Sequence, residues 1–348
     1  MKKGIQCWFV ASFLFYAGSN FIGGGSDPKA TLLQLFDTYD LVAVSEFHRA
    51  NEVHQFLRSL IQSKGLSDKH VTNIVVEFGN AKYQDLADRY VMGEQVPASE
   101  VRQIWQNTTQ FLAWDSPLYE QFFRTVKEAN SQLPRPERIR IILGDPPIGW
   151  EITHTKADYE RYADRDLFYA NVVEREVLNR NQKALLIAGG LHLINAREQE
   201  KDIPDKSRSA GDLLHRRHPR KLFVLWSVKE PIPAVQCGVP CIMIVRGSNL
   251  ENQSFAPFAP KGILVQKINS GEKQWVPLDA GDWPSVVRMT DGLIYFGANL
   301  TTIDPNPKVY QDTIYVKELR RRAAILSEVY GMDFGKQLDE AISSGAGK

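Results

Sequence analysis

The stretch Leu41-Val42-Ala43-Val44-Ser45-Glu46-Phe47-His48 sets the pattern of the chain, because a short apolar run ends on polar side chains. An apolar run of this length is typical of a buried strand. A helix is expected next, since apolar residues recur at helical spacing over 53–61. Asn51 is its expected N-cap, and Gly65 is its expected stop.

The same unit recurs along the chain. Further buried strands are expected at 73–76, 138–143, 184–188 and 222–226, and helices at 82–92, 99–110, 116–131, 160–180 and 206–217. Apolar strands that alternate with helices are typical of a parallel sheet buried on both sides. The sequence therefore predicts an α/β fold with a mostly parallel central sheet covered by helices on both faces.

The chain after residue 228 has a different character. It is richer in Pro and Gly, with short β-like runs at 241–246, 262–268 and 292–296 and a helical tail at 313–345. We interpret it as a continuation of the same unit, so that 28–348 form a single α/β domain.

The N-terminus has the pattern of an export signal. Lys2 and Lys3 precede an apolar run over 7–17, and small residues at 17–19 offer a cleavage site. A Gly-rich leader follows up to residue 27. The pattern predicts an exported protein, periplasmic or extracellular. The alternative is membrane association through a retained N-terminal segment.

Two cysteines remain after such a cleavage, in the stretch Cys237-Gly238-Val239-Pro240-Cys241. In an oxidising compartment they could form a disulfide, and otherwise they would be two thiols near a strand start. A zinc site is not expected there, because two thiols alone provide too few ligands.

The charge balance argues against a nucleic-acid partner. Lys and Arg total 42 and Asp and Glu total 41, which leaves a net charge of +1. Basic clusters occur at 215–221 and 320–322, and we interpret them as a solvated loop and a solvated helix face.

Polar side chains end four of the predicted strands. They are Glu46 with His48, then Glu77, Asp145 and His192. In open parallel sheets, ligands bind outside the carboxyl ends of the strands, so these side chains should converge in one crevice. The alternative is that each one is a helix cap or a turn residue. Asp145 is the weakest of them, because Asp-Pro is also an ordinary turn signal.

Two chemistries suit such a cluster. A neutral imidazole can take a proton from water while a carboxylate fixes its tautomer. Imidazoles and carboxylates together could also hold a divalent metal with an open position for water. Gly189 and Gly190 would let the His192 ring swing back over the sheet edge. A nucleophilic serine is not supported, because no Gly-x-Ser-x-Gly motif occurs.

Several short motifs, taken together, are similar to those of a known superfamily. Ser45-Glu46-Phe47-His48, with His54 six residues on, resembles the Gly-Glu-x-His motif of the erythromycin esterase/ChaN/Tiki superfamily. The stretches 75–78, 163–166, 187–192 and 291–297 resemble later motifs of that superfamily in the same order. The resemblance covers about residues 38–300 and implies the same α/β fold.

The resemblance also implies roles for individual residues. His48 would be the water-activating base or a metal ligand, with Glu46 and Glu77 orienting or polarising it. His192 would be the second imidazole, and Arg165 would bind an anionic group or stabilise an oxyanion. Without the resemblance, Arg165 would be interpreted as a surface charge.

This sequence departs from the family pattern at two points. Ser45 replaces the first Gly, and the second His motif is Gly-Gly-Leu-His where the family has Gly-x-Gly-His. Both departures bear on the geometry of the site.

Members of this superfamily differ in function, and three hypotheses follow. The first is a hydrolase of an ester or amide bond in a small-molecule or peptide substrate, with or without a divalent metal. The second is a ChaN-like envelope protein that binds haem or another ligand without turnover, although no axial haem ligand stands out. The third is a degenerate member that kept only the fold.

The remaining histidines and tryptophans receive structural interpretations. His154, His215 and His218 lie in polar stretches and are expected to be solvated. Trp105, Trp114 and Trp150 are expected to fill the core, although they could also line the cleft.

Overall fold

The computed structural model describes residues 27–195, 204–232, 237–259, 264–269, 272–277 and 283–346. Within these residues, the centre of the molecule is a seven-stranded sheet in the order β3-β2-β4-β1-β5-β9-β6. All neighbouring strands are parallel except β6, which is antiparallel to β9. The strands are β1 (Leu41–Glu46), β2 (Asn73–Asn80), β3 (Arg140–Asp145), β4 (Ala184–Gly189), β5 (Leu222–Val228), β6 (Cys241–Ile244) and β9 (Gly292–Tyr295).

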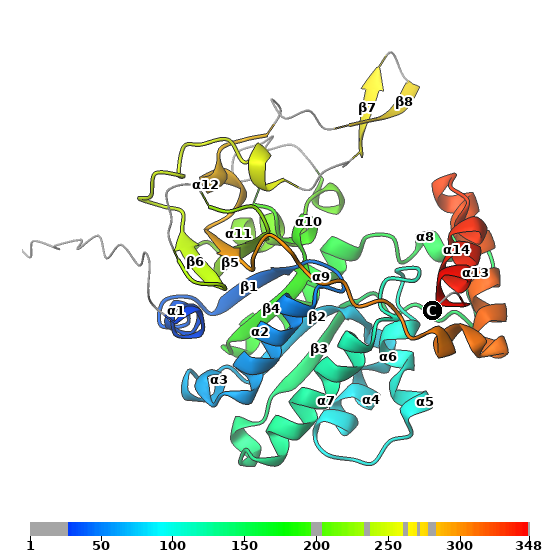
Figure 1. Cartoon of the computed structure of the whole chain (residues 1–348), viewed down its shortest axis with the longest axis horizontal. Coiled ribbons are helices and arrows are strands. Elements are labelled where there is room, and N and C mark those ends of the chain that lie inside the picture. Colours follow the sequence, from blue (N-terminus) through cyan, green and yellow to red (C-terminus); the bar gives the residue numbers. More distant parts are fainter. Residues whose placement is uncertain are drawn as a thin grey trace, which may run out of the picture.

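Helices pack on both faces of this sheet (Figure 1), which confirms the predicted α/β fold class. The alternation of side chains along β1 shows why. Val42 and Val44 point into a cluster with α2 and α7, whereas Leu41 and Ala43 point into a cluster with α9 and α11. The helices are α1 (Pro28–Leu35), α2 (Asn51–Gln62), α3 (Gly65–Asp68), α4 (Gln84–Val91), α5 (Ala98–Val101), α6 (Gln103–Gln106), α7 (Pro117–Ser131), α8 (Lys156–Glu160), α9 (Arg165–Glu176), α10 (Gly190–Leu193), α11 (Ala210–Arg217), α12 (Val286–Met289), α13 (Thr313–Tyr330) and α14 (Phe334–Ala346).

The strand order places the ends of β1, β2, β3 and β4 next to one another. The chain first runs from β1 outward to β2 and β3, and then returns to insert β4 between β2 and β1. Glu46 at the end of β1 is therefore in register with Gly189 at the end of β4. The carboxyl ends of these parallel strands form one edge, where a ligand site is expected.

The strands β6 and β9 come from the chain after residue 228 and join this same sheet. A hairpin of β7 (Leu264–Asn269) and β8 (Glu272–Pro277) forms a separate two-stranded sheet. The predicted helical tail is divided at Gly331, whose φ of 68° ends α13 in the left-handed region. That 28–348 form one domain stays a prediction.

The predicted start and stop of the helix after the first strand, α2, were wrong. Asn51 is already helical, and its N–H donates to the carbonyl of Thr301, so Ala50 takes the N-cap position. The helix ends at Gln62, before an extended Ser63, and Gly65 instead begins α3. A side chain at Gly65 would collide with Leu33, which explains the glycine.

Two other predicted helices are shorter than expected. The stretch 99–110 divides into α5 and α6 and ends at Gln106. The stretch 160–180 contains α9, which begins at Arg165 after a separate short helix, α8, with a Thr155–Asp158 capping box. The late start of α9 brings Arg165 to the strand-end edge.

The predicted export signal and the alternative N-terminal membrane segment fall on 1–26, which lie outside the described residues. Among the residues that are described, no helix is long and apolar enough to cross a membrane. Cys237 and Cys241 form a disulfide, which decides between the two alternatives left open for that pair.

The two basic clusters are largely neutralised by acidic neighbours. Arg216 pairs with Asp212, and Arg217 pairs with Glu174 and Asp205. In the other cluster, the three arginines at 320–322 pair with acidic residues of α13 and α14. The interpretation of these clusters as a solvated loop and a solvated helix face was wrong in part, because 215–217 belong to α11 and Arg322 is buried.

Candidate functional site

The strand-end side chains lie together, as the strand order requires. Glu46 ends β1, His48 follows it, Glu77 lies on β2, and His192 lies on α10 directly after β4. β4 lies between the other two strands and ends in Gly189. A Cβ at Gly189 would lie 3.0 Å from Cε1 of His48 and 3.3 Å from Oε1 of Glu77. The absent side chain therefore lets His48 and Glu77 approach each other over the end of β4.

We predict that Gly189→Ala lowers activity at this site by roughly tenfold, because the new methyl group displaces His48 from Glu77. Stability should change by less than about 1 kcal/mol, since the His48 ring is half-exposed and can move. Steady-state assays and thermal unfolding check this. Gly238→Ala is the matched control, because a Cβ there meets nothing within 4 Å. An unchanged kcat/KM in Gly189→Ala would contradict the prediction.

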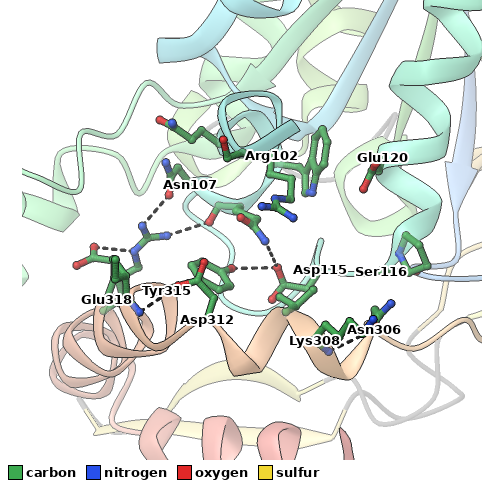
Figure 2. Close-up of a pocket in the computed structure, with 18 residues that line it drawn as sticks. Arg102, Asn107, Asp115, Ser116, Glu120, Asn306, Lys308, Asp312, Tyr315 and Glu318 are labelled. Carbon is green, nitrogen blue, oxygen red and sulfur yellow. Dashed lines mark hydrogen bonds and ion pairs between the residues drawn. The ribbon is translucent and has the colours of Figure 1, made fainter. Parts of the chain in front are cut away.

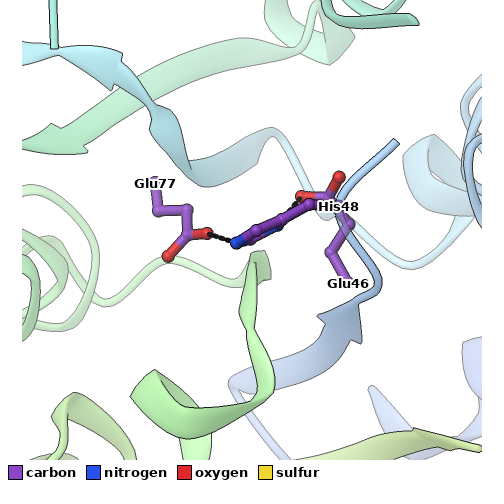
Figure 3. Close-up of side chains that lie close together, drawn as sticks. All are labelled: Glu46, His48 and Glu77. Carbon is purple, nitrogen blue, oxygen red and sulfur yellow. Dashed lines mark ion pairs between the residues drawn. The ribbon is translucent and has the colours of Figure 1, made fainter. Parts of the chain in front are cut away.

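The His48 imidazole lies between two carboxylates (Figure 3). Its Nδ1 is 3.7 Å from Oε2 of Glu46, and its Nε2 is 3.6 Å from Oε1 of Glu77. Both distances exceed that of a hydrogen bond, so the ring is held near the carboxylates without being bonded to them. Burial would lower the pKa of His48, but the two carboxylates outweigh it and raise that pKa above its usual value. The side chain is 44% exposed, so a substrate can reach it.

Trp114 packs edge-on against His48, with ring centroids 4.7 Å apart. Trp105, Trp114 and Trp150 are all buried, as predicted. Trp114 thus belongs to the core and also forms one wall of the site. Its position could not be inferred from the sequence, because the segment before α7 carries no strand-end signal.

Glu46 is held in place by two buried side chains, His54 and Tyr119. His54 Nε2 lies 2.8 Å from Glu46 Oε1, and the Tyr119 hydroxyl donates to the same oxygen at 2.9 Å. Burial would raise the pKa of Glu46, but the nearby imidazoles of His54 and His48 outweigh burial and lower that pKa to about 2. Glu46 is therefore ionised and presents Oε2 to His48. His54 was visible as part of the motif, whereas Tyr119 is 73 residues away from Glu46 and gave no signal.

His192 lies between two further carboxylates. Its Nδ1 is 2.9 Å from Oδ1 of Asp166, and its Nε2 is 3.2 Å from Oε2 of Glu77. Burial opposes the charged form, but Glu77 and Asp166 outweigh it and raise the pKa of His192. Asp166 also accepts a hydrogen bond from the first backbone N–H of α11, which fixes its carboxylate. Asp166 was not predicted as a site residue, although it lies beside Arg165 in the family motif.

Arg165 is not a surface charge, because only 14% of its side chain is exposed. Its Nε donates to Asp145 Oδ1 at 3.1 Å, and one terminal nitrogen is 3.4 Å from Nε2 of His192. Asp145 also accepts hydrogen bonds from the hydroxyl and the backbone N–H of Thr109. Asp145, predicted as a catalytic group, is thus fully bonded, and its geometry is that of a residue that positions Arg165.

Buried polar atoms without a hydrogen bond concentrate at this site. Six such side-chain atoms occur in the described part of the chain, and five of them belong to Glu46, His54, Glu77 and Trp114. Both carboxylate oxygens of Glu77 and Oε2 of Glu46 are among them. Unsatisfied buried groups are costly, so natural proteins keep them chiefly where a ligand, an ion or water completes them. The unsatisfied atoms therefore indicate a functional site.

Glu46, His48 and Glu77 also fit a divalent cation. One donor atom from each lies within 4.8 Å of the others. Carboxylate and imidazole donors are a common set for divalent transition metals. Oε2 of Glu46 and Oε1 of Glu77, the oxygens nearest His48, make no hydrogen bond and so keep lone pairs for a ligand. Among the residues that the structure describes, no side chain is distinguished in a comparable way as an axial haem ligand, so haem binding stays a prediction.

The three histidines expected to be solvated differ from one another. His154 is exposed, as predicted. His218 is partly buried and lies 2.9 Å from Glu174. The prediction was wrong for His215, whose side chain is only 10% exposed and lies 3.6 Å from Asp291. The burial of His215 could not be inferred from the sequence, because its neighbours Arg216 and Arg217 are charged.

Ser45 has a structural use where the family motif has glycine. Its hydroxyl accepts a hydrogen bond from the backbone N–H of Ser227, and its carbonyl accepts one from the Ser227 hydroxyl. These bonds join the ends of β1 and β5 beside the site. Ser45 therefore stabilises the end of β1, from which Glu46 projects.

No family model matches the chain, and no curated protein matches it at a significant level. Solved structures that it resembles include ChaN of Campylobacter jejuni, described with cofacially bound haem. ChaN is 15% identical, and the similarity covers 60% of this chain and 88% of that chain with a TM-score of 0.39. A mutant of the erythromycin esterase EreC in its open conformation is 12% identical, with 79% and 94% covered and a TM-score of 0.47. A succinoglycan biosynthesis protein is 10% identical, with 79% and 92% covered and a TM-score of 0.48.

Each of these similarities has a TM-score below 0.5 and an identity of 15% or less, so none of them assigns a function or a superfamily to this chain. The similarity concerns the fold alone. The side chains of this protein are therefore the basis for its proposed function.

Proposed function

We propose that this protein is a hydrolase of ester or amide bonds and that the strand-end cluster is its active site. The observation that carries the proposal is the half-exposed imidazole of His48 between the buried carboxylates of Glu46 and Glu77. Both carboxylates keep oxygens without a hydrogen bond. Such an arrangement suits a group that exchanges protons with water and substrate.

In the proposed reaction, His48 takes a proton from a water molecule. The hydroxide adds to the carbonyl carbon of the substrate, and the C–O or C–N bond then breaks. The leaving group receives the proton from His48, so the imidazole is restored. Glu46 and Glu77 stabilise the transient imidazolium by their charge, and His54 and Tyr119 keep Glu46 in place.

Arg165 and His192 supply the positive charge for the oxyanion. Nδ1 of His192 is bonded to Asp166, and its Nε2 faces Glu77, so both carboxylates favour the charged ring. Arg165 is always charged, and Asp145 fixes its direction. Fixed positive groups at the oxygen where negative charge develops are a major source of catalysis.

Glu46, His48 and Glu77 are the residues that would hold a divalent cation, as their donor set allows. A cation there would polarise the carbonyl and lower the pKa of a bound water. We predict that turnover survives a chelator such as EDTA, because His48 is proposed as the base. Turnover that disappears with EDTA and returns with Zn²⁺ or Mn²⁺ would instead make His48 a ligand.

The test of the proposal is a panel of aryl esters, lactones and short peptides, assayed with the chain after removal of residues 1–26. Each substrate is assayed with EDTA and with added Zn²⁺ or Mn²⁺. A haem titration followed at the Soret band runs in parallel. Hydrolysis without a Soret shift supports the proposal, and a Soret shift without hydrolysis would favour the ligand-binding alternative.

We also propose that the protein is exported and that its substrate is a small molecule or a peptide. The Lys2-Lys3 start and the apolar run after it motivate export, and the Cys237–Cys241 disulfide suits an oxidising compartment. N-terminal sequencing of the protein recovered from the outside of the cell membrane checks this. An intact Met1 on cytoplasmic protein would contradict it.

A further inference from the structure

A separate cavity of about 550 Å³ lies on the other side of the segment that carries Trp114. One wall is formed by α5, α6 and the start of α7, and the other by residues 306–312 and the first turns of α13 (Figure 2). None of the six predicted catalytic residues lines it. Its volume is that of a small-molecule site.

The floor of this cavity is the buried carboxyl group of Asp115. Tyr315 donates to it at 2.9 Å, and Tyr310 and Gln106 donate to it at 3.3 Å. Burial raises the pKa of Asp115 above its usual value, although these donors oppose the shift. Because its oxygens are already bonded, Asp115 is not available to attract a cation.

Two further acidic residues of the lining are also engaged. Glu318 pairs with Arg321 and Arg322, and Asp312 caps α13 by accepting hydrogen bonds from its first-turn backbone N–H groups. Arg322 is also bonded within the protein, because it donates a hydrogen bond to the side chain of Asn107 in addition to its ion pair with Glu318. The bonds of Glu318 and Asp312 lie within α13 and its cap, whereas Arg322 joins α13 to Asn107.

Three donors that line the cavity have no partner among the described residues. They are the guanidinium of Arg102, the indole N–H of Trp105 and the ammonium of Lys308. Trp105 is only 3% exposed, so its free N–H belongs to a buried side chain. Among the acidic lining residues, Glu120 is the one that makes no hydrogen bond or ion pair with the described residues, so two unpaired cations face one unpaired carboxylate.

We propose that this cavity binds a small organic anion through Arg102, Trp105 and Lys308. A carboxylate or a phosphate ester is the matching chemistry, because a guanidinium and an ammonium supply charge and the indole supplies a neutral donor. The two cationic side chains come from opposite walls, so the ligand spans the cavity between the 99–120 segment and the C-terminal helices.

One segment of the chain borders both the cavity and the His48 site. Asp115 and Glu120 line the cavity, whereas their neighbours Trp114 and Tyr119 contact His48 and Glu46. Trp105 and Trp114 therefore lie on the two sides of this segment, and intrinsic tryptophan fluorescence should report the binding.

The experiment titrates the full chain with citrate, inorganic phosphate and glucose 6-phosphate, followed by tryptophan fluorescence and thermal unfolding. We expect saturable binding of at least one anion. Comparison of citrate with the two phosphate compounds shows whether the cavity recognises a carboxylate or a phosphate. Arg102→Gln should weaken it roughly tenfold or more, because a charge-assisted hydrogen bond is lost. Lys308→Gln should have a smaller effect. Arg161→Gln is the matched control, an exposed arginine outside the cavity, and should bind as the wild type does.

Two outcomes would overturn the proposal: no saturable binding of any of the three anions, or binding that Arg102→Gln leaves unchanged. Trp105→Phe keeps an aromatic ring beside Phe123 and removes the indole N–H, so it tests the neutral donor. If Trp105→Phe fails to fold, the partly exposed Arg102 still decides the question. The assay needs no turnover, so its result is independent of the proposed hydrolase activity.

Discussion

His48→Ala should lower kcat/KM by roughly 10² to 10⁴, because the reaction loses its proton acceptor. The melting temperature should hardly change, since the His48 side chain is 44% exposed and makes no hydrogen bond within the described chain. Steady-state kinetics and thermal unfolding on the same preparation measure both effects.

His154→Ala is the matched control for this prediction. His154 is an exposed histidine outside the strand-end cluster, so its loss should leave kcat/KM unchanged. Equal activity of His48→Ala and wild type would remove His48 from the mechanism. A large fall in melting temperature would mean that His48 has a structural role instead.

Asp145→Ala should lower the free energy of unfolding by about 3 kcal/mol, because Arg165 then loses its buried partner. The Asp145 side chain is fully buried and that of Arg165 nearly so. The hydroxyl and backbone N–H of Thr109 would also lose their acceptor. Chemical denaturation followed by circular dichroism measures this change.

Asp37→Ala is the matched control for Asp145→Ala. Asp37 pairs with Lys69 at the surface, where an ion pair contributes under about 1 kcal/mol. Similar losses in the two variants would show that burial of Asp145 is unimportant. Activity of folded Asp145→Ala should also fall, since Arg165 is no longer aimed at the site.

The α/β fold was predictable because buried parallel strands have a simple sequence signature. The runs that end at Glu46 and Glu77 are apolar on both faces, and each is followed by a polar group. Such runs need no long-range information to be recognised. Helix ends were less predictable, since Asn51 bonds with the distant Thr301 and Gly65 packs against Leu33.

The site could be predicted only as far as its strand ends. Glu46, His48, Glu77 and His192 are close together because β4 lies between β1 and β2. The alternation of strands and helices predicts the parallel direction of these strands but not their order. Tyr119 and Trp114 come from α7 and the loop before it, and only three-dimensional packing brings them to β1. The role of Asp145 was also hidden, because only its contacts show that it holds Arg165.

The most direct test of the proposed hydrolase is carried out in water enriched in ¹⁸O, with the panel substrate that turns over fastest. Wild type and His48→Ala are compared at equal protein concentration, and the acid product is analysed by mass spectrometry. We predict that the wild type forms product carrying one ¹⁸O atom and that His48→Ala forms almost none. No turnover of any panel substrate, or equal product from His48→Ala, would contradict the account.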